Sequence, residues 1–380
     1  MSVSQAVCSI HNKADWAGVR VLLRASLNVP VQDGVVTDVY RLEHAVPTIR
    51  FLLEQQARVI VVGHIGRAQD ESLVPVHTAL QQLLPILWGG DHTTQEAQAK
   101  LADLAAGEAI LLENMRHFSG ETENDPGFAT ELATLADVYV NDAFANMHRS
   151  HASMVGVAEL LPAYAGLRVV EEVTALAAAR TPKHPSLFIL GGAKFETKLS
   201  LVERYIGVYD EVFVGGALAH DVMRARGYEI GRSLVSDIAL SEVPVIADER
   251  LVLPLDVVVR QQDGNSKTVA IDGVAPEDTI LDCGPKTVAY LQERAATAKT
   301  ILWNGPLGNY EAGLTAGTEG VATAVADSPA ASYVGGGDTV AAIQAVGRND
   351  DFTFISTGGG AMLSYLEHGE LPALTPLLRK

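Results

Sequence analysis

The sequence predicts an α/β fold of two doubly wound parallel-sheet domains. Short apolar runs rich in β-branched residues alternate with amphipathic stretches from one end of the chain to the other. Continuous apolar strands separated by helices are typical of parallel sheets that are covered on both faces. A length of 380 residues also exceeds what one compact core usually contains, so two domains are favoured.

In the first half of the chain, the predicted strands end in basic and amide side chains. The strands are expected at residues 19–24, 57–63, 109–113 and 136–141. The side chains that follow them are Arg24, Ser26, Asn28, His64, Arg67, Asn114, Arg116, His117, Asn141, Asp142, His148, Arg149 and His151. Cations and amides gathered at strand ends suit a small, multiply charged anion, because the planar guanidinium group matches carboxylate and phosphate. Arg41, just after a short loop, is placed to join them.

In the second half, four predicted strands run into glycine clusters and then into helix-like stretches. The strands at 186–190, 211–214, 332–334 and 352–356 lead into glycines at 191–192, 215–216, 335–337 and 358–360. Glycine lets backbone N–H groups approach a ligand closely, and the start of the following helix carries a partial positive charge. Such turns along one edge of a parallel sheet would bind anions. This half is therefore expected to bind phosphate groups.

A single helix is expected to join the two halves. The alanine-rich stretch over residues 166–180 has helical spacing and stops before a Thr-Pro pair. It would separate an N-terminal domain at 1–165 from a C-terminal domain at 181–365. The last ten residues, 371–380, are apolar at intervals, which favours a docked tail over a free one.

The overall charge and the cysteine content narrow the classes of partner. With 46 acidic and 28 basic residues the net charge is −18, which argues against nucleic acid or an anionic membrane as partner. Cys8 and Cys283 lie far apart in sequence, which fits a reducing compartment. The chain lacks an apolar run as long as a membrane span, and its N-terminus lacks a long apolar segment. A cytoplasmic protein is therefore expected.

Lys194 and Lys198 are the most informative basic residues of the second half. They follow a strand and a double glycine, and a spacing of four residues would put both ammonium groups on one helix face near its N-terminus. Lysine at this end of a helix opposes the helix dipole unless an anion lies between them. Phosphate contact is therefore favoured over the alternative of two solvated surface lysines.

Two glycine-rich loops suggest where nucleotide phosphates and a metal ion would bind. The segment STGGGA at 356–361 follows an apolar strand and is a candidate phosphate loop. The segment GGGDT at 335–339 adds Asp338, which is suited to hold Mg²⁺ on nucleotide phosphates. A helix N-cap explains this aspartate about equally well, so both interpretations stay open. Neither loop matches the Walker pattern or the dinucleotide-binding pattern GxGxxG.

The segment WNGPLGNYE at 303–311 follows another apolar strand. Its Asn304 could donate to a phosphate and its Glu311 could accept from ribose hydroxyls, although a tight turn with a surface glutamate explains the segment on its own.

His148 and His151 lack a third ligand at a familiar spacing, which disfavours a metal site. Cys283 is expected to be a buried thiol rather than a nucleophile.

The two halves together have the layout of a kinase for a small phosphorylated acid. One domain gathers arginines around a small anion, and the other gathers glycines and two lysines around a nucleotide. Domain closure would then bring the two halves together.

A series of motifs occurs along the chain in one order. They are RASLNVP at 24–30, GHIGR at 63–67, LLENMRHF at 111–118, NDAFANMHRSHAS at 141–153, LGGAKFETK at 190–198, LDCGPKT at 281–287, WNGPLGNYE, GGGDT and STGGGA. With these motifs the chain resembles the phosphoglycerate kinase family over essentially its full length. The resemblance implies phosphoryl transfer between 1,3-bisphosphoglycerate and ADP, giving 3-phosphoglycerate and Mg-ATP in glycolysis. It also implies a monomer of two α/β domains with a hinge helix, and a C-terminal tail at 366–380 packed on the N-terminal domain.

The resemblance implies a role for each matching position. The phosphoglycerate would be held by Asn28, Arg41, His64, Arg67, Arg116 and Arg149, with Ser26 beside them and Arg41 also near the transferring group. Lys194 would follow the transferring phosphoryl group, to which Gly358 and Gly359 would offer N–H groups. The nucleotide would be bound by Lys198, Gly216, Asn304, Pro306, Glu311, Gly337, Asp338 and Thr339, and Asp338 would also hold Mg²⁺.

Several positions depart from the family pattern, among them Ala68, Ala145-Asn146 and Asn309-Tyr310, and two departures lie at the expected ligand sites. Ser26 stands where the family has an aspartate that accepts a hydrogen bond from the substrate hydroxyl, and Ala217 replaces a glycine beside the adenine pocket. The phosphoryl acceptor is a carboxylate that is already ionised at pH 7, so transfer requires no base. We expect Ser26 to weaken glycerate binding by ~1 kcal/mol and to leave an active enzyme. The alternatives are a non-catalytic relative that binds the same ligands, and a kinase for a related small acid.

Overall fold

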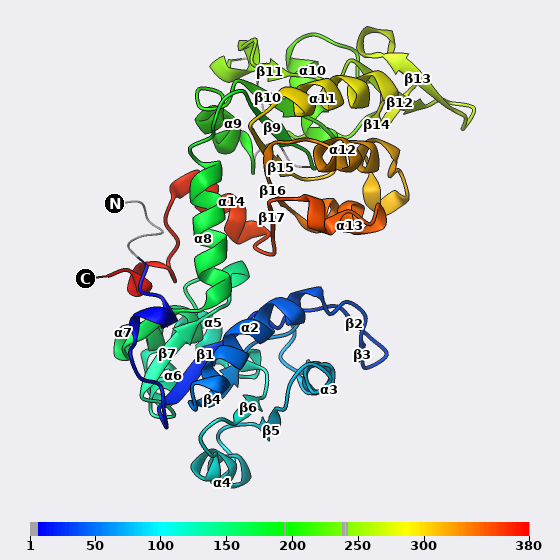
Figure 1. The fold of residues 1–380 in the computed structure, drawn as a ribbon. Helices are drawn as coiled ribbons and strands as arrows, with labels where there is room; N and C mark the ends of the chain where they lie inside the picture. Colours follow the sequence, from blue (N-terminus) through cyan, green and yellow to red (C-terminus); the bar gives the residue numbers. More distant parts are fainter. Residues whose placement is uncertain (1–6, 194, 196, 238–239, 241, 380) are drawn as a thin grey trace. The chain divides into compact units, whose positions relative to one another are not determined.

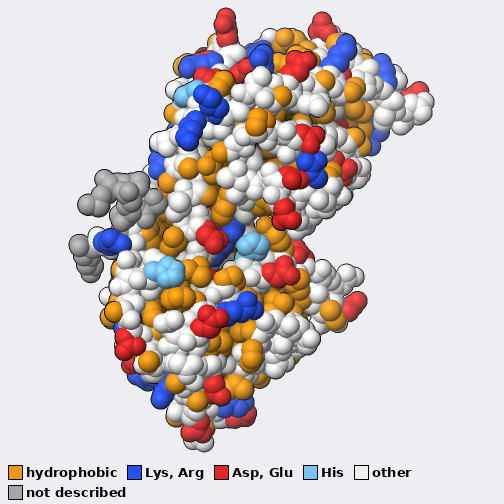
Figure 2. Space-filling view, in the orientation of Figure 1, with side chains coloured by type: hydrophobic (Ala, Val, Ile, Leu, Met, Phe, Trp, Pro, Cys, Tyr) orange, Lys and Arg blue, Asp and Glu red, His pale blue; other side chains and the backbone are white. Residues whose placement is uncertain are grey.

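The computed structural model describes residues 7–193, 195, 197–237, 240 and 242–379 (Figure 1). The chain divides into two compact units. One unit comprises the described residues up to Thr174 together with those from His368 onward, and the other spans Ala175–Glu367. On the face shown in Figure 2, acidic and basic side chains are interspersed over both units, so the excess negative charge does not form one continuous patch there.

The first unit is built on a sheet of six parallel strands in the order β5-β6-β4-β1-β7-β8. The strands are β1 (Arg20–Arg24), β4 (Arg58–Val62), β5 (Leu87–Gly90), β6 (Ala109–Leu112), β7 (Val138–Asn141) and β8 (Ala163–Ala165). The four predicted strands form the centre of this sheet. The two edge strands were not predicted, because β5 contains a Gly-Gly pair and β8 has only three residues.

One face of this sheet packs against the long helix α2 (Tyr40–Glu54). Leu42, Ile49 and Leu52 share one side of the helix and are fully buried. They belong to a core that also contains Val21 and Val59, whereas the neighbouring strand residues point to the opposite face. The other helices are α3 (Val74–Leu80), α4 (Gln95–Asp103), α5 (Ser119–Glu123), α6 (Pro126–Ala133) and α7 (Val157–Leu160), with 3₁₀ turns at Ile10–Asn12, Met115–His117, Phe144–Asn146 and Thr375–Leu377, a π-helical turn at Ala152–Gly156, and a hairpin of β2 (Val31–Gln32) and β3 (Val35–Val36).

The second unit contains another sheet of six parallel strands, in the order β11-β10-β9-β15-β16-β17. They are β9 (Ser186–Leu190), β10 (Glu211–Val214), β11 (Leu251–Val252), β15 (Thr300–Asn304), β16 (Ala331–Gly335) and β17 (Phe354–Ser356). The helices are α9 (Leu199–Tyr205), α10 (Ala217–Ala225), α11 (Pro285–Thr297), α12 (Ala316–Ala326), α13 (Gly337–Ala345) and α14 (Gly360–His368), with 3₁₀ turns at Pro244–Ala247, Ile271–Gly273, Tyr310–Ala312 and Asn349–Asp351. The prediction of two doubly wound parallel sheets is confirmed.

A small antiparallel sheet in the second unit was not predicted. It has the order β13-β12-β14 and consists of β12 (Asp256–Arg260), β13 (Ser266–Ala270) and β14 (Thr279–Cys283). The outer strand β13 is polar and largely exposed, so it lacks the apolar pattern of the other strands. Residues of β12 and β14 line a pocket in this unit.

The helix expected between the two halves forms as α8 (Leu167–Ala179). The buried carboxylate of Asp142 accepts hydrogen bonds from backbone N–H groups in the first turn of this helix, those of Arg168 and Val169.

Among the described residues, every helix is too short or too polar to cross a bilayer.

The C-terminal tail packs on the first unit, as predicted. The backbone N–H of Cys8 donates to the carbonyl of Leu377 at 2.7 Å, and the N–H of Ala373 donates to the carbonyl of Met147 at 3.1 Å. These bonds join the two ends of the described chain to each other and the tail to the segment that follows β7.

Candidate functional site

Three arginines and two histidines gather in the first unit. Arg24, His64, Arg116, Arg149 and His151 form this basic cluster. The pKa of His64 lies well below its usual range, mainly because the ring is buried. Positive charge on the four other members of the cluster lowers it further. Burial also lowers the pKa of Arg116, and the charges of Arg149 and Arg24 lower it further. Cations held so close together create a strong site for an anion.

The parallel sheet brings the basic cluster together. Arg24 is the last residue of β1, His64 follows β4, Arg116 lies in the turn after β6, and Arg149 follows β7. Arg24 is fully buried, and its guanidinium donates to Nδ1 of His64 at 2.8 Å. Because arginine can only donate, Nδ1 of His64 accepts, and the proton of the neutral ring therefore resides on Nε2.

A second chain of hydrogen bonds joins Asn28 and Arg41 to the basic cluster. The Arg41 guanidinium donates to the backbone carbonyl of Asn28, and the Asn28 side-chain oxygen accepts from the N–H of Gly66 at 2.9 Å. The carbonyl of Gly66 in turn accepts from the guanidinium of Arg116. Arg67 is the next residue, and its side chain is exposed. The structure thus links Asn28 and Arg41 to the basic cluster, whereas no such contact is seen for the side chain of Arg67 among the described residues.

Ser26 lies between Arg24 and Asn28 and has an unusual environment. The residue is 7% exposed, and among the described residues its buried hydroxyl has no hydrogen-bond partner. A buried hydroxyl without a partner is unfavourable unless a ligand completes its bonding. The position therefore fits a ligand that carries its own hydroxyl group.

A buried carboxylate behind the basic cluster was missed from the sequence. Glu121 is fully buried and accepts from the hydroxyl of Ser153 at 2.7 Å and from its backbone N–H at 2.9 Å. Ser153 also accepts from Nε of Arg24 at 2.9 Å. Burial raises the pKa of Glu121, but His151, Arg24 and Ser153 together hold it below its usual range. The burial of Glu121 could not be predicted from the sequence, because the residue lies in a short polar helix that resembles a surface helix.

In the second unit, the glycine turns that follow the strands approach one another closely. Gly192, Gly216, Gly305 and Gly336 have positive φ angles between 60° and 121°, which favour glycine over other residues. At Gly191 a Cβ atom would lie 2.1 Å from the carbonyl oxygen of Pro306. Only a residue without a side chain fits this contact.

Lys198 lies among these turns. Its ammonium group donates to the carbonyl of Gly191 at 2.5 Å and to the side-chain oxygen of Asn304 at 3.2 Å. Burial lowers the pKa of Lys198 to about 8, and the negative charge of Asp338 opposes this shift. The lysine is therefore a desolvated cation at the edge of the sheet, close to a carboxylate.

The expectation that Lys194 and Lys198 share a helix face is wrong for Lys198. This residue precedes α9, with φ −127° and ψ −5°, and is not part of the helix. The chain stays non-helical because the lysine reaches back to the glycine turn instead of along a helix surface. Lys194 lies outside the described residues.

Asp338 is the second residue of α13, and its N-cap is Gly336. The alternative interpretation as an N-cap is therefore wrong, and this carboxylate makes no capping hydrogen bond. The next residue, Thr339, is fully buried, and its hydroxyl accepts from the N–H of Gly305 at 2.9 Å. Within the described part of the chain, no group of three or more acidic, histidine or cysteine side chains could hold a metal ion by itself. A single oxygen ligand of this kind suits Mg²⁺ that is bound mainly by nucleotide phosphates.

Asn304 and Gly358 already make hydrogen bonds within the protein. The amide nitrogen of Asn304 donates to the carbonyl of Gly335 at 2.9 Å, and its oxygen accepts from Lys198. The N–H of Gly358 donates to the hydroxyl of Ser356 at 3.0 Å. Gly359 has φ 50° and immediately precedes α14.

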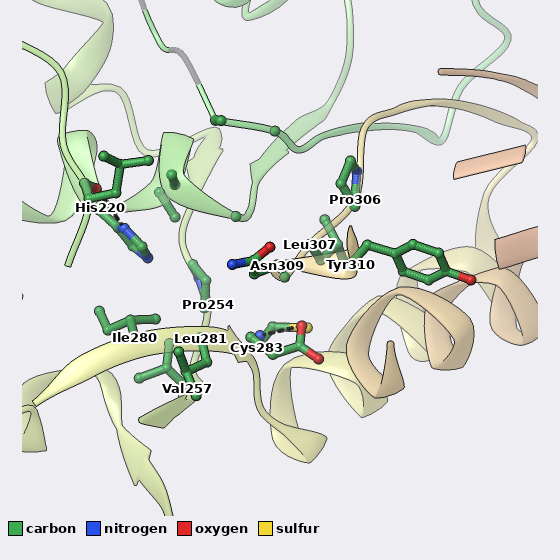
Figure 3. A pocket seen from close by; sticks show the side chains of 18 of the residues that line it. His220, Pro254, Val257, Ile280, Leu281, Cys283, Pro306, Leu307, Asn309 and Tyr310 are labelled. Atoms are coloured by element: carbon green, nitrogen blue, oxygen red, sulfur yellow. Dashed lines mark hydrogen bonds between the residues drawn. The ribbon is translucent and has the colours of Figure 1, made fainter. Parts of the chain in front are cut away.

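Beside these turns lies a pocket of about 380 Å³ (Figure 3). The predicted residues Gly216, Pro306, Glu311 and Asp338 line it, together with Ala217. The opposite wall comes from α10 and the antiparallel sheet, with Ala219, His220, Met223, Leu234, Pro254, Val257, Arg260, Thr279, Ile280, Leu281, Asp282 and Cys283. These residues were not predicted as site residues, because the sheet that carries most of them was not predicted. A pocket of this size that is lined by both glycines and apolar side chains suits a nucleotide.

Cys283 is a buried thiol, as the sequence predicts. Cys283 is buried at the end of β14, and burial together with nearby carboxylates raises the pKa of its thiol far above its usual range. Such a thiol is a poor nucleophile.

Comparison with known proteins identifies the family. The phosphoglycerate kinase family model matches residues 11–369. A phosphoglycerate kinase of Rubrobacter xylanophilus is 46% identical over 375 residues, which cover 95% of each chain, and one of Roseiflexus sp. is 42% identical over 96% of this chain and 97% of its own. The chain belongs to the phosphoglycerate kinase family.

Solved structures agree with this assignment. The structure of phosphoglycerate kinase from Coxiella burnetii has a TM-score of 0.84 and 36% identity, and covers 98% of both chains. That from Pyrococcus horikoshii has a TM-score of 0.85 and 31% identity, and covers 97% of this chain and 98% of its own. Membership confirms the prediction of a phosphotransferase that uses ATP or ADP.

Proposed function

We propose that this kinase catalyses the reaction of its family with its ligands divided between the two units. Phosphoglycerate would bind at the basic cluster, and the nucleotide would bind in the pocket beside the glycine turns. The observation that carries the proposal is the basic cluster itself, in which buried cations lower one another's pKa values. Such an arrangement is stabilised when a multiply charged anion binds to it.

On the glycerate side, the groups with unused donors are proposed to contact the substrate. Arg67, Arg116 and Arg149 would bind phosphate and carboxylate oxygens, since guanidinium groups match both. Nε2–H of His64 would donate to the acid, because Arg24 occupies Nδ1. Asn28 and Arg41 would complete the site, and the unpartnered hydroxyl of Ser26 would bond to the substrate hydroxyl.

On the nucleotide side, Lys198 and Asp338 would act on the phosphates. The desolvated ammonium of Lys198 would neutralise phosphate oxygens, and Asp338 would hold Mg²⁺ on them. Pro306 would pack on the nucleoside and Glu311 would accept from the ribose, since both line the pocket. Backbone groups of Gly216 and Gly337 would approach the nucleotide. Asn304 and Thr339 would position these groups rather than touch phosphate, because their polar atoms already bond to Lys198, Gly335 and Gly305.

The chemistry would be electrostatic, with no general base. In the direction of ATP synthesis, the bond between the acyl oxygen and phosphorus breaks as the β-phosphate oxygen of ADP bonds to phosphorus, and a carboxylate leaves. The carboxylate is stable at pH 7, so the side chains need not move a proton. Mg²⁺, when bound, would spread the nucleotide's negative charge. Arg41, Lys194, Gly358 and Gly359 are proposed to neutralise the transferring group, as the resemblance implies.

Several further expectations remain predictions. They are the domain limits at 165 and 181, hinge-bending closure, a monomeric state, the absence of nucleic-acid or membrane partners, and a cytoplasmic location. The net charge of −18 supports the view that neither nucleic acid nor an anionic membrane is a partner.

The test is a coupled assay of ATP formation from 1,3-bisphosphoglycerate and ADP, and of the reverse reaction with a panel of small carboxylates. We expect transfer in both directions with 3-phosphoglycerate as the preferred acid. A rate at background with intact nucleotide binding would instead indicate a non-catalytic relative. Clear preference for another acid would show that Ser26 has changed the specificity.

The substitution Lys194→Ala should abolish phosphoryl transfer without unfolding the protein. Near-normal turnover in this variant would contradict the role proposed for Lys194.

A further inference from the structure

His220 stands out in the wall of the pocket. It lies in the first turn of α10, is 6% exposed, and lines the pocket together with the apolar residues Met223, Leu234 and Ile280. In Figure 3 its ring points into the pocket. A histidine in such a wall adds one directional polar group to a surface that otherwise recognises shape.

The tautomer of His220 follows from its hydrogen bond. Nδ1 lies 2.8 Å from the backbone carbonyl of Leu234. A carbonyl can only accept, so the proton resides on Nδ1 and the lone pair on Nε2. Burial lowers the pKa of His220, although the bond to Leu234 and the charge of Asp221 oppose the shift. The ring is therefore neutral at pH 7, and Nε2 is a hydrogen-bond acceptor.

The pocket itself supplies no donor to this acceptor. Among the described residues, none donates a hydrogen bond to Nε2 of His220, whereas Nδ1 is occupied. Met223 and Ile280 beside it are apolar, and the carboxylate of Asp282 already accepts from the N–H groups of Gly317 and Cys283. A ligand that reaches this wall must offer a donor of its own to satisfy Nε2.

We propose that His220 sets the base specificity of this kinase by accepting a hydrogen bond from the 6-amino group of adenine. The inference rests on the proposed function, which places a nucleotide in the pocket with its phosphates near Lys198 and Asp338. The base then lies toward the apolar wall, where His220 is. Guanine and hypoxanthine carry a carbonyl at position 6, and two acceptors facing each other repel.

One other polar group could reverse the preference. Arg260, at the end of β12, also lines the pocket, and its exposed side chain is a donor. If this guanidinium rather than His220 met the base, a 6-carbonyl would be favoured over a 6-amino group. The two assignments therefore predict opposite orders of affinity.

The experiment measures the dissociation constants of ADP, of IDP, and of purine ribonucleoside diphosphate, which lacks only the 6-amino group. The variants are His220→Phe, which keeps a ring and removes the acceptor, and the control His11→Phe, which makes the same change at an exposed position of the first unit. We expect the wild type and the control to bind ADP roughly tenfold more tightly than the other two, as one hydrogen bond between well-placed groups allows. In His220→Phe all three should bind about equally.

Three outcomes would overturn the proposal. They are equal binding of ADP and purine ribonucleoside diphosphate by the wild type, a preference for IDP, and a full preference for ADP in His220→Phe. Turnover with each diphosphate, measured in parallel, separates this result from the proposed function. If the wild type transfers phosphate to ADP but shows no preference for it, only the contact between His220 and the base is contradicted. If none of the three diphosphates accepts phosphate, the proposed kinase reaction is contradicted, whatever the binding preference.

Discussion

Ser26 shows how a single side chain adjusts a site without removing it. Its buried hydroxyl lies beside fully buried Arg24 in a region rich in positive charge. A carboxylate there would accept a stronger hydrogen bond than a hydroxyl does. In the proposed site, Ser26 would therefore supply an acceptor without the charge of the aspartate that the resemblance implies.

We predict that Ser26→Asp lowers the KM for 3-phosphoglycerate about fivefold, which corresponds to about 1 kcal/mol. The KM for ATP should not change, because the residue lies in the first unit. Steady-state kinetics with each substrate varied in turn measures both values. Ser26→Ala is the matched control and should raise the KM for the acid. An unchanged value in both variants would mean that position 26 does not touch the substrate.

Lys198 predicts a pH dependence of nucleotide binding. Its pKa of about 8 in the free protein is lowered by burial, and bound phosphates favour the charged form and raise this pKa. The affinity for ADP should therefore fall as the pH rises through about 8, by at most about tenfold per unit, until the pKa of the complex is reached. Calorimetric titration between pH 7 and 9.5 measures the trend. Lys198→Met should bind ADP weakly and with a flat profile, and the same slope in this variant would refute the assignment.

At the scale of the element, Glu121 connects α5 to the π-helical turn and to β1. It accepts both bonds from Ser153, which also bonds to Arg24. Removal of its charge would leave the buried guanidinium with less compensation. We expect Glu121→Gln to lower the free energy of unfolding by about 3 kcal/mol, whereas the exposed neighbour Glu123→Gln should have little effect.

The pH dependence of the free energy of unfolding provides a second test of the role of Glu121. The folded-state pKa of Glu121 is lowered, so its contribution is present above the unfolded pKa near 4.5 and is lost as the pH falls through the folded value. The wild type should lose more stability than Glu121→Gln below that pH. Urea unfolding followed by tryptophan fluorescence measures this, with Trp303→Phe as the common background so that only Trp16 and Trp88 of the first unit report. Parallel curves for the two proteins would show that Glu121 is not an ionised partner.

The glycine turns provide a prediction about backbone contact. A Cβ atom at Gly191 would lie 2.1 Å from the backbone oxygen of Pro306, whereas at Gly337 nothing lies within 4 Å. Gly191→Ala should therefore lower the midpoint of thermal unfolding and weaken ADP binding strongly. Gly337→Ala should leave the midpoint nearly unchanged. Equal midpoints for the two variants would contradict the close packing of these turns.

The elements show why part of the fold could be predicted. The central strands are buried on both faces and read as continuous apolar runs, so β9 and β10 were predicted with the limits that the structure shows. The polar strand β13 carries no such pattern. As a result the wall with Val257 and Ile280 was missed, because these residues lie on the antiparallel sheet to which this polar strand belongs. The start of α9 was misjudged because a tertiary hydrogen bond holds Lys198 outside the helix.

At the scale of the whole molecule, we propose that the same architecture serves two ligands. Each unit has six parallel strands, and each gathers its functional groups at the carboxyl ends of those strands. The first unit would supply side-chain cations, and the second would supply backbone N–H groups and the half-buried Lys198. The sequence could reveal this division because the residue after each strand is fixed by the topology.

The central claim is that the basic cluster binds the glycerate and the glycine-lined pocket binds the nucleotide. It is tested most directly by calorimetric titration of Arg149→Ala with 3-phosphoglycerate and with ADP. The account predicts that the dissociation constant for 3-phosphoglycerate rises at least about tenfold, as loss of a charge-assisted contact requires, while that for ADP is unchanged. Unchanged binding of 3-phosphoglycerate, or equal loss of both ligands in a folded protein, would contradict it.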